Sequence, residues 1–459
     1  MSHSLRAAFV STAVLLACTF APANTVAQAQ TITRQTTPSG LQFRYVQMPE
    51  ALFQSLYFAW RDGTAVALPG KEAVPTLGAN LIMEGPRGLS RSAMIEEFRD
   101  LQATASVSAT VSLVRGQLTA PRGKFSAAVR LSARVLTDPA LPKERLAELT
   151  KNATIAIRQG EGNAETTAQR LLSRLLIADG PYRRYLSGDP SIYEDITLAD
   201  IEAWRRNILV RDRLTLVSVG PMDAAEAGRE IDTLFAGLPA SGSPPAAAKP
   251  VLRAPGKLVV LERPAVQTAI AAGGPMTLAI TPDLLRTQLA VSVLGSGVSS
   301  RLWRAVREKL GAAYGISGAM QAVELHTRIL AIRTAVANDK AAGVISAIRE
   351  EYGRILADGV TEAEIDPLKR AAVTGHRERI SRSPALAAAL LVLALQDYPD
   401  DYLSTYEQRL NGYGRAAIEA DMRAAFPPSP LTFAVVAPSA EGLGADCVIK
   451  ALAEIARCD

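Results

Sequence analysis

The sequence predicts an α+β protein built from two homologous halves, each an antiparallel-rich sheet with helices packed on it. Its length of 459 residues exceeds the roughly 250–300 residues at which one hydrophobic core stops growing, so two domains are expected. A stretch rich in Pro, Ser, Gly and Ala over residues 240–256 lacks periodicity, as linkers do. The strand-like segment Leu214–Pro221 also returns near the end of the chain as Leu431–Pro438, which indicates a duplication.

The first half, residues 30–239, begins with two strand-like segments separated by a turn that contains proline, and it then becomes mainly helical. The strands are expected at Leu41–Met48, Phe53–Trp60 and, closing the half, Leu214–Val219. Helical spacing of apolar residues predicts helices at Pro75–Met83, Lys143–Arg158, Thr166–Ala178 and Leu198–Asn207.

The second half, residues 257–459, follows the same order. Strands are expected at Lys257–Glu262 and Thr268–Gly273, and helices at Pro282–Leu294 and Ser299–Leu310. Asp358–Thr361 before Glu364 repeats Asp138–Leu141 before Glu144, which again matches one half to the other.

Composition excludes several classes of protein. Hydrophobic residues make up 48% and charged residues 21% of the chain, which favours a globular protein over a disordered one. The 50 basic and 45 acidic residues form no basic block, so no nucleic-acid partner is expected. No apolar run is long enough to predict a membrane span.

Residues 1–29 are typical of a cleaved signal peptide. Arg6 gives a short positive region, Ala7–Phe20 is apolar, and Ala27–Ala29 matches a small-x-small cleavage site. We therefore expect a periplasmic or secreted protein. The alternative is a lipoprotein anchored at Cys18, because Leu15–Cys18 is a loose lipobox.

Cys447 and Cys458 would meet an oxidising compartment, in which disulfides form. On one continuous helix they would lie about 16 Å apart, too far for a disulfide. Pairing therefore requires that one of them sits off the helix, and the sequence leaves both states open.

The segment 69–85 contains Thr76-Leu77-Gly78-Ala79-Asn80. It resembles the first core helix of the pitrilysin-type, or inverzincin, metallopeptidases, the family of the mitochondrial processing peptidase. In that family His-x-x-Glu-His supplies two zinc ligands and a general base. The two histidine positions are here Thr76 and Asn80, and the glutamate position is Ala79. A hydroxyl and a carboxamide are poor ligands for zinc.

The resemblance places the third zinc ligand at Ile155 or Ala156, and both are apolar. The histidines of the second half, His326 and His376, lie outside any ligand spacing, so we expect structural roles for them. Glu84 is expected to be solvated or ion-paired. This chain should bind no catalytic zinc.

A second segment, 297–314, carries the most specific resemblance to the same family. The family pattern Ser-Arg-Leu, Arg-Glu-x-x-Gly and Tyr is matched in register by Ser300, Arg301, Leu302, Arg307, Glu308, Gly311 and Tyr314. The resemblance implies that Arg307 and Tyr314 reach across a closed chamber to a zinc site. There they would hold the substrate backbone and stabilise the tetrahedral intermediate, since both are donors suited to developing negative charge.

Both residues also have an ordinary structural explanation. We expect Arg307 in the last turn of a helix ended by Gly311, where the helix dipole favours a cation. Tyr314 would begin the next strand as a packing residue. A weaker candidate, Tyr182–Tyr185, could line the chamber, but a surface turn is the expected structure.

The resemblance covers nearly the whole mature chain and implies a clamshell of two facing halves. Because one half-site is lost and the other retained, we expect a homologous zinc-bearing partner subunit that this chain complements in trans. The substrate would be a peptide or a small unfolded protein. The alternative is a non-catalytic peptide-binding or scaffold protein of the same fold. An active peptidase with an unconventional site has no three ligands available.

Overall fold

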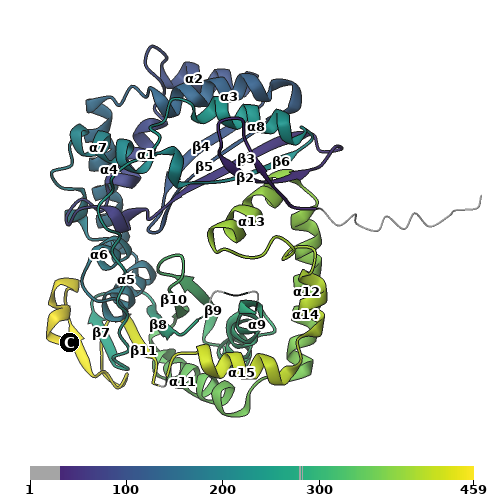
Figure 1. Cartoon of the computed structure of the whole chain (residues 1–459). Helices are drawn as coiled ribbons and strands as arrows, with labels where there is room; N and C mark the ends of the chain where they lie inside the picture. Colours follow the sequence, from purple (N-terminus) through teal and green to yellow (C-terminus); the bar gives the residue numbers. More distant parts are fainter. Residues whose placement is uncertain (1–30, 279–280, 282, 429, 459) are drawn as a thin grey trace, which may run out of the picture.

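The computed structural model describes residues 31–278, 281, 283–428 and 430–458, and in it the chain forms two α/β halves (Figure 1). The proposed signal peptide and Cys18 lie outside the described residues. Each half contains a six-stranded mixed sheet in which antiparallel pairs predominate. The predicted α+β class with two layered halves is confirmed.

The strands of the two sheets come from successive parts of the chain. The first sheet has the order β1-β2-β6-β3-β5-β4, with β1 (Thr33–Thr36), β2 (Gln42–Gln47), β3 (Phe53–Arg61), β4 (Thr104–Ala109), β5 (Leu113–Pro121) and β6 (Leu214–Gly220). The second has the order β12-β7-β11-β8-β10-β9, with β7 (Leu258–Glu262), β8 (Thr268–Met276), β9 (Ala313–Ala322), β10 (Arg328–Val336), β11 (Thr432–Ala437) and β12 (Cys447–Ile449).

The strand pairing repeats from one half to the other. In the first sheet β6 runs parallel to β2 and antiparallel to β3. In the second sheet β11 runs parallel to β7 and antiparallel to β8. The two segments that suggested a duplication are therefore the same strand of a repeated sheet. The halves differ only in the strand beside β2 or β7, which is β1 in one sheet and β12 in the other.

The helices keep this correspondence. The first half contains α1 (Val74–Ile82), α2 (Arg91–Asp100), α3 (Arg122–Thr137), α4 (Lys143–Gly162), α5 (Ala164–Leu176), α6 (Pro181–Leu186), α7 (Leu198–Ile208) and α8 (Ala224–Phe235). The second half contains α9 (Leu284–Gly295), α10 (Arg301–Trp303), the π-helix η4 (Arg304–Lys309), α11 (Ala341–Asp358), α12 (Glu362–Ile380), α13 (Ser383–Leu395), α14 (Tyr406–Gly412) and α15 (Arg415–Ala425). Short 3₁₀ turns are η1 (Thr64–Val66), η2 (Pro190–Tyr193), η3 (Arg211–Arg213), η5 (Asn338–Lys340) and η6 (Leu452–Cys458).

The two halves exchange a helix. Helix α5 of the first half packs on β8 and β11 of the second sheet, and α13 of the second half packs on β3 and β6 of the first sheet. Because β3 corresponds to β8 and β6 to β11, the exchange is reciprocal. Helix α13 is apolar on nearly every side, although its Val392 is 52% exposed.

The exchanged helices explain why both faces of each sheet are buried. Along β8, Ile270 packs into the core of its own half, whereas its neighbour Ala271 packs into the cluster that includes α5. Along β6, Leu216 lies in the first-half core and Val217 in the cluster formed with α13. Alternate residues of a strand point to opposite faces, so each sheet is closed by its own helices on one side and by the other half on the other.

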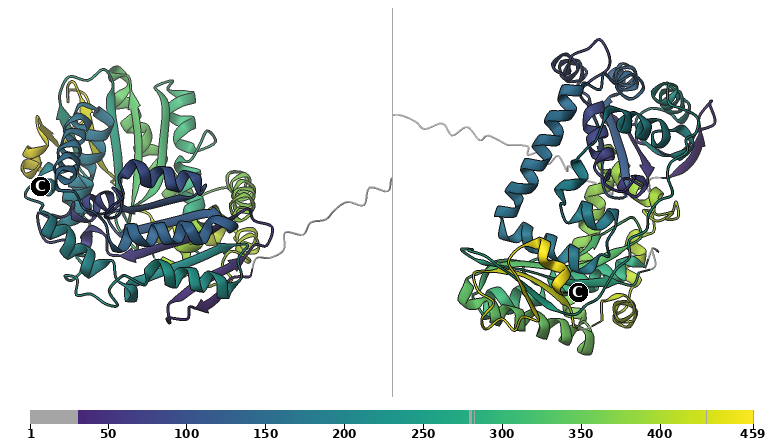
Figure 2. Two further views of the ribbon diagram at one scale, coloured as in Figure 1. Left: turned by 90° about the horizontal axis from the view of Figure 1, so that it is seen from above. Right: turned by 90° about the vertical axis from the view of Figure 1, so that its left-hand side faces the viewer.

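The linker between the halves is bonded to the rest of the protein. Helix α4 runs between the halves along one side of the molecule (Figure 2), and the linker at 240–256 is hydrogen-bonded rather than loose. Its Ala248 N–H donates to Ala65 O, and its Arg253 N–H donates to Leu176 O, each at 2.8 Å.

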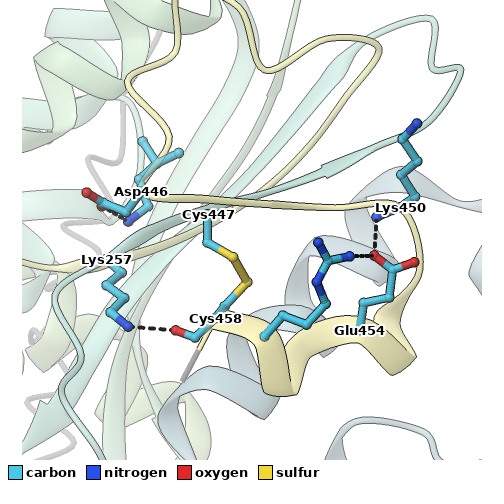
Figure 3. The surroundings of a disulfide bond; sticks show 8 residues. Lys257, Asp446, Cys447, Lys450, Glu454 and Cys458 are labelled. Atoms are coloured by element: carbon cyan, nitrogen blue, oxygen red, sulfur yellow. Dashed lines mark hydrogen bonds and ion pairs between the residues drawn. A yellow bond between two sulfur atoms is a disulfide. The ribbon is translucent and has the colours of Figure 1, made fainter.

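The C-terminal segment is fixed by a disulfide between Cys447 in β12 and Cys458 at the end of η6 (Figure 3). The Cα atoms lie 5.7 Å apart, because the first cysteine lies in a strand rather than on the same helix. Lys257 Nζ adds a 2.7 Å hydrogen bond to the carbonyl of Cys458. In the part of the chain that the structure describes, no helix is long and apolar enough to cross a bilayer.

Candidate functional site

Helix α1 carries the positions of the degenerate zinc motif. Ala79 is buried in the first-half core, Asn80 is exposed, and Thr76 is half-buried. The Oγ1 atom of Thr76 lies 3.2 Å from the hydroxyl of Tyr185 on α6, so this position is occupied by a polar contact within the protein. Thr76 and Asn80 are one turn apart, as the motif requires, but they offer a hydroxyl and an amide.

The positions of the third zinc ligand lie on α4, which packs against α1. Ile155 is 40% exposed and Ala156 is also exposed. Glu84, directly after α1, is ion-paired with Arg145 at 2.9 Å and Arg91 at 3.6 Å. An ion pair was one of the two roles expected for this residue. The residues at these positions do not fit zinc, because they supply no histidine, thiolate or free carboxylate.

No metal-binding cluster occurs elsewhere in the described ranges, where no three His, Cys, Asp or Glu side chains are grouped. His326 is exposed in the turn between β9 and β10, and His376 is buried in α12. His376 stacks on Tyr406 with ring centroids 4.2 Å apart.

The second motif separates into buried residues that shape the fold and exposed residues. Ser300 caps α10 by accepting a hydrogen bond from the Trp303 N–H, and Leu302 is completely buried. Arg301 is bound to Glu364 and also donates to the carbonyl of Gly359 at 2.8 Å. Ser300, Arg301 and Leu302 therefore stabilise the local fold. The later residues of the motif need a separate explanation.

Arg307 and Tyr314 lie together at the surface. The guanidinium of Arg307 sits 5.8 Å from the centroid of the Tyr314 ring, within the range of a cation–π contact. Tyr314 is 87% exposed, although it is the second residue of β9. Arg307 makes no ion pair among the described residues, whereas its neighbours Arg301 and Arg304 both pair with Glu364. The packing role considered for Tyr314 is therefore wrong.

The helix that presents Arg307 differs from the expected α-helix over Ser299–Leu310. After α10 the chain widens into the π-helix η4, where Leu310 N–H donates to Ala305 O and Ala312 N–H to Val306 O. Gly311 then takes φ +56°, a left-handed conformation that glycine adopts readily. Short π-helical turns are often found at functional sites, and this one places Arg307 next to the start of β9.

The two motif segments belong to different halves of the chain. No hydrogen bond, ion pair or ring contact joins Thr76, Ala79 or Asn80 to Arg307 or Tyr314 among the described residues. Within one copy of the chain, the Arg–Tyr pair and the zinc-motif helix thus form separate sites.

Sequence reasoning missed the environment of α6. The segment Tyr182–Tyr185 was expected as a surface turn, and this is wrong, because it forms a helix with Tyr182 buried. Arg184 donates from Nε to Glu72 Oε1 at 2.9 Å and also through Nη2. Glu72 is 0% exposed and stands just before α1. The signal available in the sequence was Glu72 itself, a charged residue next to the apolar sequence of α1.

The fold and these segments define a peptidase-like protein of two α+β halves that lacks zinc ligands at the family positions. A family model described as the peptidase M16 inactive domain matches residues 195–372. A protein of Rickettsia bellii described as an uncharacterized zinc protease is 22% identical over 337 residues, 72% of this chain and 79% of that one.

Three solved structures share the fold. The peptidase M16 inactive domain from Pseudomonas fluorescens has a TM-score of 0.81 at 20% identity, covering 89% of this chain and 98% of its own. A protease from Helicobacter pylori has a TM-score of 0.78 at 15% identity, covering 89% and 100%. The periplasmic protease PqqL from Escherichia coli has a TM-score of 0.75 at 16% identity, covering 95% of this chain and 49% of its own.

These matches support the M16, or pitrilysin-type, peptidase family for this chain. The match to the family model lies in 195–372 and includes Arg307 and Tyr314, but not α1. That the chain is non-catalytic by itself rests on the residues at Thr76, Ala79, Asn80, Ile155 and Ala156.

Proposed function

We propose that this protein is the zinc-free subunit of a heterodimeric periplasmic zinc metallopeptidase. It supplies Arg307 and Tyr314 to the zinc site of a homologous partner subunit. The observation that carries the proposal is the exposed, otherwise unpaired Arg307–Tyr314 pair at the surface. The zinc itself is held by the partner.

The chemistry suits these two side chains. Hydrolysis of a peptide bond places negative charge on the carbonyl oxygen, and preorganised donors aimed at that oxygen lower the barrier. A guanidinium remains protonated and presents several N–H donors, and a phenol presents one O–H. Their contact with each other limits the positions that both can take before substrate arrives.

The likeness to the longer protease PqqL fits an assembly with a second unit. The E. coli protease PqqL is about twice as long as the part that this chain matches, which leaves room for a second unit of similar size. A separate partner chain would supply that unit here. The proposed signal peptide of residues 1–29 would deliver this chain to the periplasm, the compartment that the description of PqqL names.

The substrate in this proposal is an extended peptide or a small unfolded protein. Strand β4 ends the first sheet and packs against α1, and β9, which carries Tyr314, ends the second sheet. An extended peptide can add to such an edge through its backbone. Binding through the backbone depends little on the side chains of the peptide, which suits a peptidase that accepts many peptide sequences.

The first test is an affinity purification of the tagged chain from its own periplasm, with mass spectrometry of the proteins that co-elute. The expected partner is a chain of similar size that carries His-x-x-Glu-His and brings zinc in proportion to its amount. Elution of the tagged chain alone would remove the basis for a two-subunit enzyme.

The second test uses the purified complex and a fluorogenic peptide. Arg307→Ala should lower kcat by roughly 100-fold or more, as loss of a transition-state donor does, and leave assembly unchanged in gel filtration. Lys309→Ala, on the same exposed turn, is the matched control and should keep full activity. Unchanged turnover in Arg307→Ala would favour the scaffold alternative, in which the pair is a relic.

A further inference from the structure

A cavity of about 780 Å³ lies in the second half, and neither Arg307 nor Tyr314 lines it. Its walls come from α9 and the far end of β9 in the second half, from α12, and from the exchanged helix α13 that packs on the first sheet. The segment from Tyr398 to Tyr406 closes it. All of these lining residues belong to the second half, and α13 is the wall that also packs on the first sheet.

The charge of this cavity has one sign. Arg328 and Arg379 line it, and no Asp or Glu of the described residues does. Arg328 is half-buried and makes no ion pair or side-chain hydrogen bond in the described part of the chain. Desolvation lowers the pKa of its guanidinium, which Tyr398 and Glu324 only partly offset. Glu324 itself accepts hydrogen bonds from Thr327 and the His326 N–H. An unpaired, partly desolvated guanidinium favours a carboxylate ligand.

A second polar atom in the wall lacks a partner. His376 is 2% exposed, and its Nδ1 makes no hydrogen bond. Burial lowers the pKa of the imidazole, so the ring is neutral at neutral pH, and one nitrogen of a neutral imidazole accepts a hydrogen bond. Buried polar atoms normally have a partner, but this atom has almost no accessible surface, so an occupant of the cavity does not reach it.

The rest of the wall is largely apolar. Leu285, Met320, Leu393 and the exposed Val392 line it, which suits a hydrophobic side chain. A carboxylate next to an apolar side chain is the chemistry of the last residue of a peptide.

We propose that this cavity binds the free C-terminus of a peptide whose last residue is apolar. The carboxylate pairs with Arg328, and the apolar side chain packs against the apolar wall. The assignment rests on the proposed function only in taking a peptide as the ligand.

The position of the cavity along β9 shows how far a bound peptide would have to extend to reach Tyr314. Ala319 and Met320 line the cavity, and Tyr314 lies five residues earlier on the same strand. At roughly 3.3 Å per residue this separation is about 17 Å. An extended peptide held in the cavity would thus present a bond about five residues from its C-terminus to the Arg307–Tyr314 pair.

The test measures binding by the isolated full chain, without a partner. A ten-residue peptide that ends in leucine, labelled with fluorescein at its N-terminus, is compared by anisotropy with the same peptide bearing a C-terminal amide. The free acid should bind roughly tenfold or more tightly, because the amide cannot form the charge-assisted pair. Equal affinity of acid and amide would overturn the proposal.

Variants locate the site. Arg328→Met should abolish the preference for the free acid, whereas Arg333→Met, on the same strand but bonded to Gln321 outside the cavity, should keep it. His376→Phe preserves an aromatic ring against Tyr406 and should keep the preference for the free acid. Acid preference that survives Arg328→Met in a folded variant would contradict the assignment.

Decanoate, an apolar acid without an N–H, separates a peptide terminus from a free fatty acid. If decanoate binds in an Arg328-dependent way while peptides neither bind nor compete, the cavity takes small acids and the proposal is wrong. Acid-selective peptide binding together with unchanged turnover in Arg307→Ala would instead refute the proposed function and leave this site standing.

Discussion

Arg301 and Glu364 form a two-point contact between α10 and the start of α12. Nε of Arg301 donates to Oε1 at 2.8 Å, and Nη2 donates to Oε2 at 2.9 Å. The same carboxylate accepts from the backbone N–H and the hydroxyl of Thr361, completing a capping box. One half-buried carboxylate therefore fixes both the first turn of α12 and the helix that leads to Arg307.

The first prediction concerns acid stability. Desolvation would raise the pKa of Glu364, but hydrogen bonds from Arg301 and Thr361 outweigh it and lower the pKa from its ordinary value of 4.5 to about 2. Since the folded pKa is the lower one, the ionised carboxylate stabilises the fold above pH 4.5, and this stabilisation is lost as pH falls from about 4.5 to 2.

Urea unfolding from pH 7 down to pH 3 measures this contribution. Glu364→Gln should lower the free energy of unfolding by about 1–2 kcal/mol at pH 7, with a smaller difference from the wild type near pH 3. Glu362→Gln, in the exposed first turn of the same helix, should have little effect. An equal difference at both pH values would contradict the assignment.

The second prediction concerns the buried pair of Glu72 and Arg184. Arg184→Met leaves the completely buried carboxylate of Glu72 without its cation, which typically costs about 3 kcal/mol. Adding Glu72→Gln should recover part of that loss, because no charge then remains buried. A double-mutant cycle by thermal unfolding measures the coupling, and Arg183→Met, without an ion pair among the described residues, is the control.

The third prediction concerns the packing of α1. A Cβ on Gly78 would lie 2.4 Å from Cζ3 of Trp204 on α7. At that distance the indole ring or one of the two helices must move. Gly78→Ala should therefore destabilise the protein by about 1–3 kcal/mol. Gly353→Ala, in the exposed middle of α11 with nothing within 4 Å, should stabilise it by up to about 1 kcal/mol. Similar shifts in the two Tm values would show that α1 and α7 are not tightly packed.

The fourth prediction concerns the disulfide. Replacing Cys447 and Cys458 by serine should lower the free energy of unfolding by about 2–3 kcal/mol, as expected for a closed loop of this length. Wild type treated with dithiothreitol should unfold at the same urea concentration as the double variant. A midpoint unchanged by either treatment would mean that the link does not stabilise the fold.

Much of the fold could be predicted because its local signals are strong. The expected strand at Phe53–Trp60 and helix at Lys143–Arg158 lie within β3 and α4, and Thr197 caps α7 with a capping box. The repeated segments correctly indicated a duplicated sheet.

The helix exchange could not be predicted. Periodicity shows that α5 has an apolar face, but not which sheet covers it. The buried charge of Glu72 was missed for a similar reason, since its partner lies on a helix distant in sequence. At the candidate site, the sequence predicted the lost ligands and the retained Arg–Tyr pair. Only the structure shows that Arg301 is engaged in packing while Arg307 is left exposed.

The reciprocal exchange of α5 and α13 also constrains how the chain acquires its structure during synthesis. The last strand of the first sheet, β6, is made long before residues 383–395 exist, so one apolar face of that sheet has no cover in the nascent chain. Such a surface is prone to aggregation and is a natural target for chaperones. The first half therefore cannot complete its fold until the second half has been synthesised. Neither half is expected to be stable as a separately expressed fragment.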